Sequence, residues 1–592
     1  MRTGFEKINQ VLTTELATDL PSRDRKLILF TDSRQDAAKL SSGLGLRHYQ
    51  DLLRLFLLHR QLDSGGDPAA DIQLARANVV DRVRTDETWA AYSRLEARDA
   101  TTFAQIRDVW EQRPGTKPED ETPLVARLGR GPTIEASSGA IAGQLLDLGM
   151  NPGGPHASME ETGGQGSRRW PTLYDWSAAP PVPRGNLSAD QQRLLATINQ
   201  SLLSEMLEGL FSGVGRDFES LGLGWLALAD DAMPLDIAPT NDLAYARSGL
   251  RVLADTRRFY GLRDPRSDPP RQLRNFFWRA IEQAGGPTEG ELRVKFDAQC
   301  GAAVCDFLID PNAVVLRQGD GAGWVCGNCR RLHLVRGCGY CTRCQQPLPA
   351  QGTPVSPPED DYYGWKATTD SGHFRLNCEE LTGQTDRIDA QARQSRFQNV
   401  FLDNEIARAD GVDLLSVTTT MEAGVDIGSL SAVVLGNMPP TRFNYQQRVG
   451  RAGRRGGTPV AIALTVCRGR SHDEYYFDQP TRITNDPTPQ PYLAVNRREI
   501  FLRSLNAEVL RQAMPDVEQS ILTSGGSFTP TVNVHGGFGM VAEWNAAAPV
   551  LSAWLSANRN LIQEVARAVS DRTPLAADSD SLADEVIANC QR

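Results

Sequence analysis

Two cysteine pairs are the residues whose spacing most clearly predicts chemistry. Cys326 and Cys329 form one Cys-x-x-Cys pair, and Cys341 and Cys344 form a second pair after eleven intervening residues. Two such knuckles can fold together so that four thiolates surround Zn²⁺ as a tetrahedron, which leaves no open coordination position. The spacing therefore predicts a structural zinc site with these four ligands.

Neighbouring residues leave the ligand set and the role of this segment open. Cys338 forms a Cys-x-x-Cys pair of its own with Cys341 and could replace Cys344, while His333 could also bind the metal. Such a histidine more often packs or caps a turn than binds a metal. Basic and aromatic residues surround the knuckles, namely Trp324, Arg330, Arg331, His333 and Arg336. They could grip a phosphate backbone or stack on a base, or the ribbon could simply staple an insertion that has little core of its own.

A second group of reactive residues lies near residue 450, in the run Gln-Arg-Val-Gly-Arg-Ala-Gly-Arg that spans 447–454. Arg451 and Arg454 are three residues apart, and on a short helix this spacing places both on one face. A guanidinium group presents a planar fork of donors that matches a phosphate. Two arginines placed in this way can converge on one phosphate group.

Alternating strands and helices must position these arginines. Residues 26–30 form an apolar run, followed by a turn and an amphipathic stretch over 36–60. A second series predicts strands near 414–418, 432–435 and 460–466, with a helix around 443–449. This alternation is typical of a parallel sheet whose ligand site lies at the carboxyl ends of its strands.

The roughly 300 residues between these two series differ in character. Residues 136–183 are rich in Gly, Ser and Pro and predict a loop, whereas 190–211 and 242–260 predict helices. Helical patterns return in the last part of the chain, over 497–514 and 550–569. An insertion between two parts of one sheet is the simplest arrangement.

The motifs resemble those of superfamily 2 helicases. Residues 447–454 resemble motif VI, the run Thr-Thr-Thr-Met-Glu-Ala-Gly-Val-Asp over 418–426 resembles motif V, and the strand and turn at 27–34 resemble motif IV. The resemblance implies a RecA-like second motor lobe. In such a motor, ATP lies between two lobes, and arginines of the second lobe stabilise the charge that develops on the γ-phosphate.

This resemblance implies roles for individual residues. Arg451 and Arg454 are the catalytic arginines, with Gln447 at a further fixed position of the motif, and the nucleotide-binding positions are Gly424, Asp426 and Gly450. Positions that contact the nucleic-acid strand are Ser33, Arg34 and Thr420, together with the backbone around Gly424. For Ser33 and Arg34, a purely structural role in the turn is an equal alternative.

Other segments resemble a narrower group. The runs at 378–386, 396–397 and 472–477 are similar to those of the large bacterial DEAD/DEAH-box helicases of phage-defence systems, of the DISARM and Druantia types. Those proteins also have a long, cysteine-bearing insertion in the second lobe. A role in phage defence, with further defence subunits as partners, is what this kinship implies.

The phosphate-gripping first lobe is missing from the sequence. None of the six lysines lies in a Gly-x-x-x-x-Gly-Lys-Ser/Thr loop, and no Asp-Glu-x-His or Asp-Glu-x-Asp string that could hold Mg²⁺ occurs. We therefore expect the chain alone neither to bind ATP tightly nor to hydrolyse it. The first lobe would be supplied in cis, if the chain is a fragment, or in trans, and the end within an apparent helix at 586–592 favours a fragment.

Composition limits the remaining possibilities. A net charge of −10 argues against a protein that coats nucleic acid by bulk attraction, so any contact with a strand must be local. No apolar run is long enough to span a bilayer, and the first residues lack the apolar core of a secretion signal. These features predict a cytoplasmic protein.

We therefore expect an α/β protein in which a RecA-like parallel-sheet lobe is interrupted by a long, mainly helical insertion containing a zinc ribbon. The expected parts are 1–60 (first part of the lobe, motif IV), 61–319 (helical insertion), 320–350 (zinc ribbon), 351–480 (second part of the lobe, motifs V and VI) and 481–592 (helical C-terminal region, truncated).

The expected function is that of the C-terminal lobe of an ATP-dependent helicase or translocase, acting on DNA in preference to RNA. Its expected cofactors are ATP and Mg²⁺, shared with the missing lobe, and structural Zn²⁺. The alternative is a non-catalytic adaptor that binds nucleic acid or a protein through the zinc ribbon and a vestigial lobe. An intact arginine pair argues against this alternative.

Overall fold

A computed structural model describes most of the chain. The described residues are 5–21, 25–62, 68–160, 169–211, 216–231, 235, 237–319, 321–369, 373–418, 430–453, 461–485, 487, 497–529, 531–533 and 536–590. The chain divides into two compact units, Met1–Asp486 and Pro487–Arg592.

A five-stranded parallel sheet forms the centre of the first unit, in the order β11-β12-β1-β13-β14. Its strands are β1 (Leu27–Phe30), β11 (Cys378–Leu381), β12 (Leu414–Val417), β13 (Ala432–Leu435) and β14 (Ile462–Thr465). β1 lies between β12 and β13, with Leu27 paired with Leu414 on one side and with Ala432 on the other. The two sequence segments therefore join into one sheet, and the α/β prediction is confirmed.

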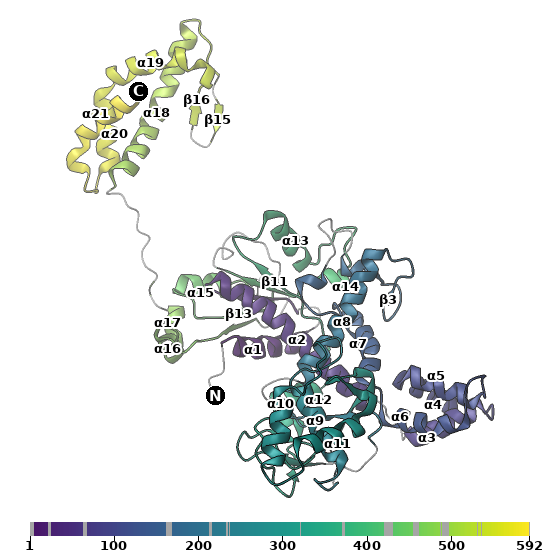
Figure 1. The fold of residues 1–592 in the computed structure, drawn as a ribbon. Coiled ribbons are helices and arrows are strands. Elements are labelled where there is room, and N and C mark those ends of the chain that lie inside the picture. The colour runs from purple at the N-terminus through teal and green to yellow at the C-terminus, as the bar shows by residue number, and fades with distance from the viewer. Residues whose placement is uncertain are drawn as a thin grey trace. The chain divides into compact units, whose positions relative to one another are not determined.

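Helices cover both faces of the sheet, because its inner strands are apolar at successive positions. Leu27 and Leu29 pack under α1 (Phe5–Asp19) and the first half of α2 (Arg34–Leu62). Ile28 and Phe30 point to the opposite face, towards α13 (Arg387–Phe397) and α15 (Arg442–Val449). This three-layer arrangement is visible around β11 and β13 in Figure 1.

The long helix α2 links the sheet to the insertion. Leu40 and Leu44 belong to the core beneath the sheet, whereas Leu52 to Leu58 belong to the core of the insertion. One uninterrupted helix of 29 residues thus contributes to both cores. The insertion is consequently anchored in the lobe by a continuous helix rather than by a loop alone.

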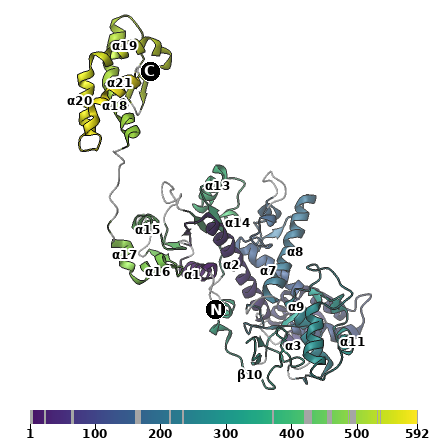
Figure 2. The same cartoon turned by 60° about the vertical axis from the view of Figure 1, so that its left-hand side comes forward.

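The insertion core consists mainly of helices. They are α7 (Ile134–Leu148), α8 (Ala189–Phe211), α9 (Asp242–Asp255), α10 (Arg271–Asn275) and α11 (Glu289–Cys300). Two short strands, β4 (Trp225–Leu228) and β7 (Val314–Arg317), pair antiparallel to each other and contribute to the same core. Figure 2 shows α7 and α8 beside α2, and α9 close to α11.

One expectation for the insertion is wrong. The Gly- and Ser-containing stretch that begins at residue 136 is not all loop, because α7 spans Ile134–Leu148. Thr133 accepts a hydrogen bond from the backbone of Ala136 and caps the start of this helix, and Gly149 ends it in the left-handed conformation. A side chain at Gly149 would meet the carbonyl oxygen of Arg408 at 1.9 Å, so glycine is required there.

Four further helices form a small cluster with an apolar core of its own. They are α3 (Pro68–Val79), α4 (Asp86–Arg98), α5 (Ala100–Trp110) and α6 (Glu121–Arg130). Phe103, Ile106 and Trp110 of α5 lie at the centre of this core. Thr85 caps α4 through a reciprocal hydrogen-bond pair with Thr88.

The cysteine-rich ribbon follows β7. It contains β8 (Ala322–Val325), β9 (Leu332–His333) and β10 (Thr353–Pro354), and the chain then returns to the sheet through α12 (Tyr362–Thr368). Lys366 of α12 forms an ion pair with Glu15 of α1 at 3.0 Å. The return helix is thereby attached to the lobe.

The second unit is mainly helical. It comprises α18 (Arg498–Thr523), α19 (Trp544–Ala557), α20 (Arg559–Ser570) and α21 (Ser579–Cys590), with a hairpin of β15 (Thr531–Asn533) and β16 (Gly536–Phe538). Its core gathers apolar residues from all four helices, such as Leu505, Leu551, Ile562 and Leu582. Among the helices of the described residues, none is both long enough and apolar enough to cross a membrane.

Candidate functional site

The turn after β1 leads directly into α2. Ser33 caps this helix, because its hydroxyl accepts a hydrogen bond from the backbone N–H of Asp36 at 3.4 Å and its carbonyl accepts one from Ala37 at 2.9 Å. Thr31 donates its hydroxyl proton to the same Ser33 carbonyl oxygen. Ser33 therefore has a structural role in this turn, and its contact with a nucleic-acid strand stays a prediction.

Arg34, the next residue, is placed differently. Its side chain is 58% exposed, and its Nε lies 3.6 Å from a carboxylate oxygen of Glu380 at the end of β11. A surface ion pair of this kind contributes about 0–1 kcal/mol, so a phosphate group could displace the carboxylate at little cost. Arg34 is therefore available to a strand that passes over the carboxyl edge of the sheet.

An arginine and two polar residues connect this turn to the motif VI helix α15. Arg448 is fully buried and donates through Nη2 to Oδ1 of Asp32 at 2.5 Å. The other carboxylate oxygen of Asp32 accepts a hydrogen bond from the side-chain amide of Asn437, which follows β13. The guanidinium also lies 5.7 Å from the centre of the Phe30 ring. We call Asp32, Asn437 and Arg448 the motor edge.

The arginine turn follows α15 rather than lying on it. The helix ends at Val449, so the expectation that Arg451 occupies one face of a short helix is wrong. A side chain at Gly450 would meet the carbonyl oxygen of Gln446 at 2.8 Å, which explains the glycine at this helix end. Gly453 has a φ of +74° and donates its N–H to Leu430 O at 2.9 Å. The helix end and the contact with Leu430 together determine the path of the turn.

Some of the remaining predicted motor residues lie in the described part of the chain, and others do not. Arg451 is buried, with 9% of its surface exposed, Gln447 is half-buried on α15, and Gly450 is exposed. Four residues lie outside the described part of the chain, namely Thr420, Gly424, Asp426 and Arg454. The expected convergence of Arg451 and Arg454 on one phosphate therefore stays a prediction.

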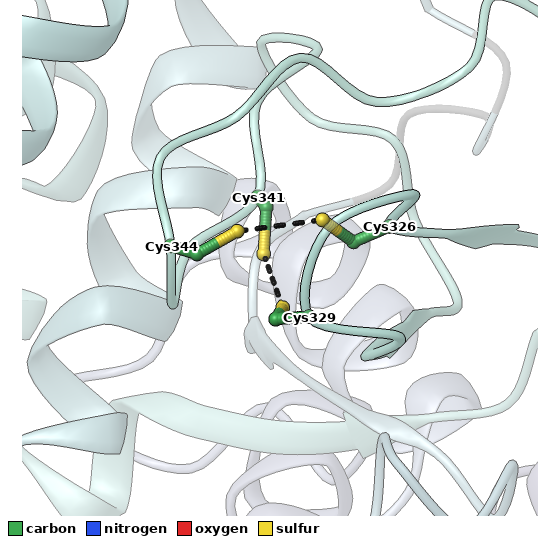
Figure 3. A group of neighbouring side chains, drawn as sticks. All are labelled: Cys326, Cys329, Cys341 and Cys344. Carbon is green, nitrogen blue, oxygen red and sulfur yellow. Dashed lines mark hydrogen bonds between the residues drawn. The ribbon is translucent and has the colours of Figure 1, made fainter.

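The four cysteines predicted to bind zinc lie close together in the structure. The sulfur atoms of Cys326, Cys329, Cys341 and Cys344 all lie within 4.8 Å of one another, and Figure 3 shows them pointing towards a common centre. The Cys326 and Cys344 sulfurs are 3.4 Å apart, and those of Cys329 and Cys341 are 3.6 Å apart. Zn–S bonds of about 2.3 Å place the sulfurs of a tetrahedron about 3.8 Å apart. The four residues thus fit Zn²⁺.

The two knuckles have the same backbone design. Cys326 accepts a hydrogen bond from the N–H of Arg330, and Cys341 accepts one from Gln345, at 3.0 and 2.9 Å. Arg330 and Gln345 both have positive φ angles, 61° and 64°, which are uncommon for residues other than glycine. This repeated turn aims both cysteines of each pair at the same point.

Ionisation in the cluster is uneven. Burial raises the pKa of Cys341, whereas burial of Cys344 is outweighed by the Gln346 N–H, the Asn328 side chain and the neighbouring thiols, which lower the pKa of Cys344 to about 6. The cluster therefore holds at least one thiol that ionises readily. Zn²⁺ binds thiolates, so the remaining protons would leave on metal binding.

The two residues that left the ligand set open lie outside the cluster. Cys338 is buried against α9, where its N–H donates to the Ser248 hydroxyl at 3.0 Å, and its thiol is not among the grouped sulfurs. His333 is fully buried, with Nε2 at 3.3 Å from the Cys341 sulfur and Nδ1 bonded to Arg251. The four cysteines that the Cys-x-x-Cys spacing predicted as ligands are therefore the four whose sulfur atoms lie together.

Buried ion pairs attach the ribbon to the insertion. Arg331 forms a two-pronged pair with Asp255 at the end of α9, and Arg251 of α9 pairs with Glu219 at 2.9 Å. Close by, Arg247 of α9 binds both oxygens of Asp231, at 2.7 and 2.8 Å, and both side chains are almost fully buried. Arg331 and His333 therefore point into the protein, which favours the stapling role of the ribbon over a grip on nucleic acid.

Sequence reasoning missed the residues that join separate segments. Asp32 and Arg448 lie inside quoted motifs but are 416 positions apart, and nothing in their local pattern marks them as partners. Glu219, Asp231, Arg247 and Arg251 also look like ordinary charged residues of exposed helices. A signal was available for Arg247 and Arg251, because they are four residues apart on one face of a helix whose other residues are mostly apolar.

Comparison with known proteins supports the motor assignment. Residues 366–456 match the helicase conserved C-terminal domain. The chain is 37% identical over 196 residues to Druantia protein DruE of Escherichia coli (strain UMEA 4076-1), which covers 30% of this chain and 10% of that protein. It is 33% identical over 87 residues to ATP-dependent helicase hrq1 of Schizosaccharomyces pombe, covering 15% and 8%.

A similar match, 36% identity over 63 residues, relates the chain to ATP-dependent helicase HRQ1 of Saccharomyces cerevisiae, covering 11% of this chain and 6% of that protein. The matched segments therefore span a tenth or less of these relatives. No solved structure matches this chain. Residues 366–456 thus carry a helicase C-terminal domain, and parts of the chain resemble Druantia protein DruE and two ATP-dependent helicases.

Proposed function

We propose that this chain supplies the second lobe of an ATP-dependent motor that translocates on nucleic acid, DNA in preference to RNA. A first lobe with a phosphate-binding loop would complete the ATP site, in cis or in trans. The similarity to Druantia protein DruE supports a role in phage defence, with other defence subunits as partners.

The observation that carries this proposal is the motor edge. Asp32 lies in the turn that precedes Ser33 and Arg34, and Arg448 lies on the helix that leads to Gly450 and Arg451. The ion pair therefore joins the turn expected to contact the strand to the turn expected to face the nucleotide. A motor needs such a connection, because ATP-driven closure must change the grip on the strand.

The residues would act as follows. Arg451 and Arg454 would place their guanidinium groups against the terminal phosphate of ATP held by the other lobe, where they offset the charge that develops during transfer. Gln447, Gly424, Asp426 and Gly450 would line the nucleotide side of the same cleft. Arg34, Ser33 and Thr420 would contact phosphates of the strand, and Mg²⁺ would be held mainly by the first lobe.

The zinc centre would have a structural role. Cys326, Cys329, Cys341 and Cys344 would bind one Zn²⁺ with no position left for a substrate. Metal binding supplies folding free energy to a segment with little apolar core. The inward direction of Arg331 and His333 supports this role over an adaptor that recognises nucleic acid through the ribbon.

The decisive experiment measures ATP hydrolysis with the first lobe added in trans or joined upstream. We expect hydrolysis to be stimulated by nucleic acid, more strongly by DNA than by RNA, and Arg454→Ala or Arg451→Ala to reduce it by about 10³-fold or more. The chain without the first lobe should show no hydrolysis.

A matched control separates this effect from general loss of positive charge. Arg503→Ala, at an exposed position of α18, should leave the stimulated rate unchanged. If both arginine variants keep normal turnover, the motor proposal is wrong and the adaptor alternative takes its place. Metal analysis of the purified chain should give one zinc per molecule, and a value near zero would remove the zinc centre from the proposal.

A further inference from the structure

A chain of buried polar groups ends on one cysteine of the zinc centre. Nη2 of Arg251 contacts Nδ1 of His333, whose Nε2 lies 3.3 Å from the sulfur of Cys341. Glu219 holds Arg251 through two contacts, from Nε at 3.0 Å and from Nη2 at 2.9 Å. The Glu219 carboxylate also accepts the backbone N–H of Leu334 at 3.0 Å, so it is itself held by the ribbon.

The contact with Arg251 determines where the proton of His333 lies. A guanidinium group has donors only, so the ring atom that faces it must accept, and Nδ1 therefore carries no proton. The single proton of the neutral ring is then on Nε2, the atom that faces the sulfur. A doubly protonated ring would also carry a proton on Nδ1, facing the donors of Arg251, so the same contact requires the neutral ring.

The same geometry excludes His333 as a metal ligand. Binding zinc through Nε2 would require a free electron pair there and a proton on Nδ1, which would then face the N–H groups of Arg251. His333 also stands outside the group of four ligand atoms that lie within 4.8 Å of one another. It reaches the centre through its contact with Cys341.

We propose that Glu219, Arg251 and His333 form a positioning chain that donates a hydrogen bond from Nε2 of His333 to the Cys341 thiolate and so retains the metal. This inference rests on the proposed zinc centre. Four thiolates around Zn²⁺ carry a net charge of −2, and a donor aimed at one sulfur spreads that charge and holds the ligand in place. The hydrogen bond also makes the thiolate less reactive towards protons and oxidants that would release the metal.

The test measures how fast the zinc-loaded, 592-residue chain releases its metal to an excess of a chromogenic chelator, followed by the absorbance of the zinc–chelator complex. His333→Phe keeps a flat ring of similar size but removes the donor, and zinc release should become about tenfold faster or more. Arg251→Met should act in the same direction, because the ring then loses the group that keeps its proton on Nε2. Trp324→Phe, which alters the apolar packing around the cysteines but removes no hydrogen bond, because the indole N–H has no hydrogen-bond partner among the described residues, should change the rate less than threefold.

The outcomes distinguish the inference from the zinc centre itself. A wild-type chain that holds no zinc overturns the centre, and the inference falls with it. A wild-type chain with one zinc, together with His333→Phe that releases it at the wild-type rate, overturns the inference alone.

A second measurement serves if His333→Phe does not fold. Nitrogen-15 NMR of the zinc-loaded wild-type chain, with its histidines labelled, should show that the ring of His333 is neutral and carries its proton on Nε2. A ring protonated on Nδ1, or one bound to metal through Nε2, would contradict the proposal.

Discussion

Two arginine–aspartate pairs in this molecule consist of the same residue types but differ in their surroundings. In the insertion, Arg247 binds both oxygens of Asp231, and the two side chains are 2% and 0% exposed. At the motor edge, Arg448 is equally buried, but its partner Asp32 is 38% exposed. The first pair is enclosed by protein, whereas water reaches one side of the second.

This difference indicates what each pair can do. Separating Arg247 from Asp231 would leave two buried charges without water, so we expect that pair to stay closed and to hold its segments together. Separating Arg448 from Asp32 costs less, because the carboxylate is already partly hydrated. Opening this pair would leave only the Arg448 guanidinium buried, so it suits a part that changes shape better than the enclosed pair does. The enclosed pair suits the scaffold around the ribbon.

Removal of zinc should have the largest effect and should affect the insertion first. Structural zinc sites hold about 10 kcal/mol of apparent binding free energy, most of which is folding free energy. We expect chelation, or Cys341→Ser, to make the segment around α9 and the ribbon accessible to protease while the central sheet stays folded. Limited proteolysis followed by mass spectrometry checks this.

Cys305→Ser is the matched control for that experiment, since Cys305 is exposed and stands outside the metal cluster. Protease sites that appear first in the sheet strands rather than in the insertion would break the proposed division between scaffold and motor edge.

Breaking the enclosed pair should come second. Asp231→Asn or Arg247→Met alone should lower the free energy of unfolding by about 3–5 kcal/mol, because the remaining charge stays buried. The double variant should lose less than the sum of the two, since the cation that then loses Asp231 is Arg317, whose Nη1 lies 3.5 Å from Asp231 and whose side chain is 26% exposed. Urea unfolding of the four proteins gives the coupling free energy, and strictly additive losses would show that the pair is not enclosed in solution.

A buried histidine on α2 should make stability depend on pH. Burial lowers the pKa of His48 to about 4, against 6.5 in the unfolded chain, and its Nε2 lies 2.7 Å from the carbonyl oxygen of Phe374. Below pH 6.5 the unfolded chain takes up the proton first, so stability should be lost as the pH falls, by about 3 kcal/mol in total once the pH reaches 4.

Unfolding measured from pH 7 to pH 4.5 in wild type and His48→Gln isolates this contribution. Glutamine can still donate to Phe374 but does not titrate, so the difference between the two curves should grow towards low pH. Parallel curves would contradict the assigned pKa. His48 lies between the residues of α2 that pack on the sheet and those in the insertion core, so the result reports on their junction.

The sequence predicted those parts of the fold that depend on local pattern. The runs predicted at 26–30, 414–418 and 432–435 are mostly apolar, which is typical of strands buried on both faces, and they supply the inner strands of the sheet. The cysteine spacing likewise predicted the four residues that the structure groups. In both cases the signal lies within a few neighbouring residues.

What could not be predicted depends on contacts between distant segments. The helix expected to hold Arg451 ends at Val449, because the chain leaves it to meet Leu430 through Gly453. Asp32 and Asn437 become partners only after β1 is inserted beside β13. Polar pairing of this kind leaves no periodicity in a single sequence, so it required the structure.

The smallest stability effect should follow from Asp32→Asn at the motor edge. Asparagine keeps an oxygen that can accept from Arg448 but loses the charge and the second oxygen, which accepts from Asn437. Water can reach the side chain, so we expect a loss of about 1–2 kcal/mol, clearly less than for Asp231→Asn. Urea unfolding of both variants under the same conditions tests the difference. Equal losses would mean that the two pairs are equivalent and that the partial exposure of Asp32 carries no functional meaning. A small loss of stability joined to a large loss of nucleic-acid stimulation in the two-lobed motor would instead assign Asp32 to the coupling of strand and nucleotide.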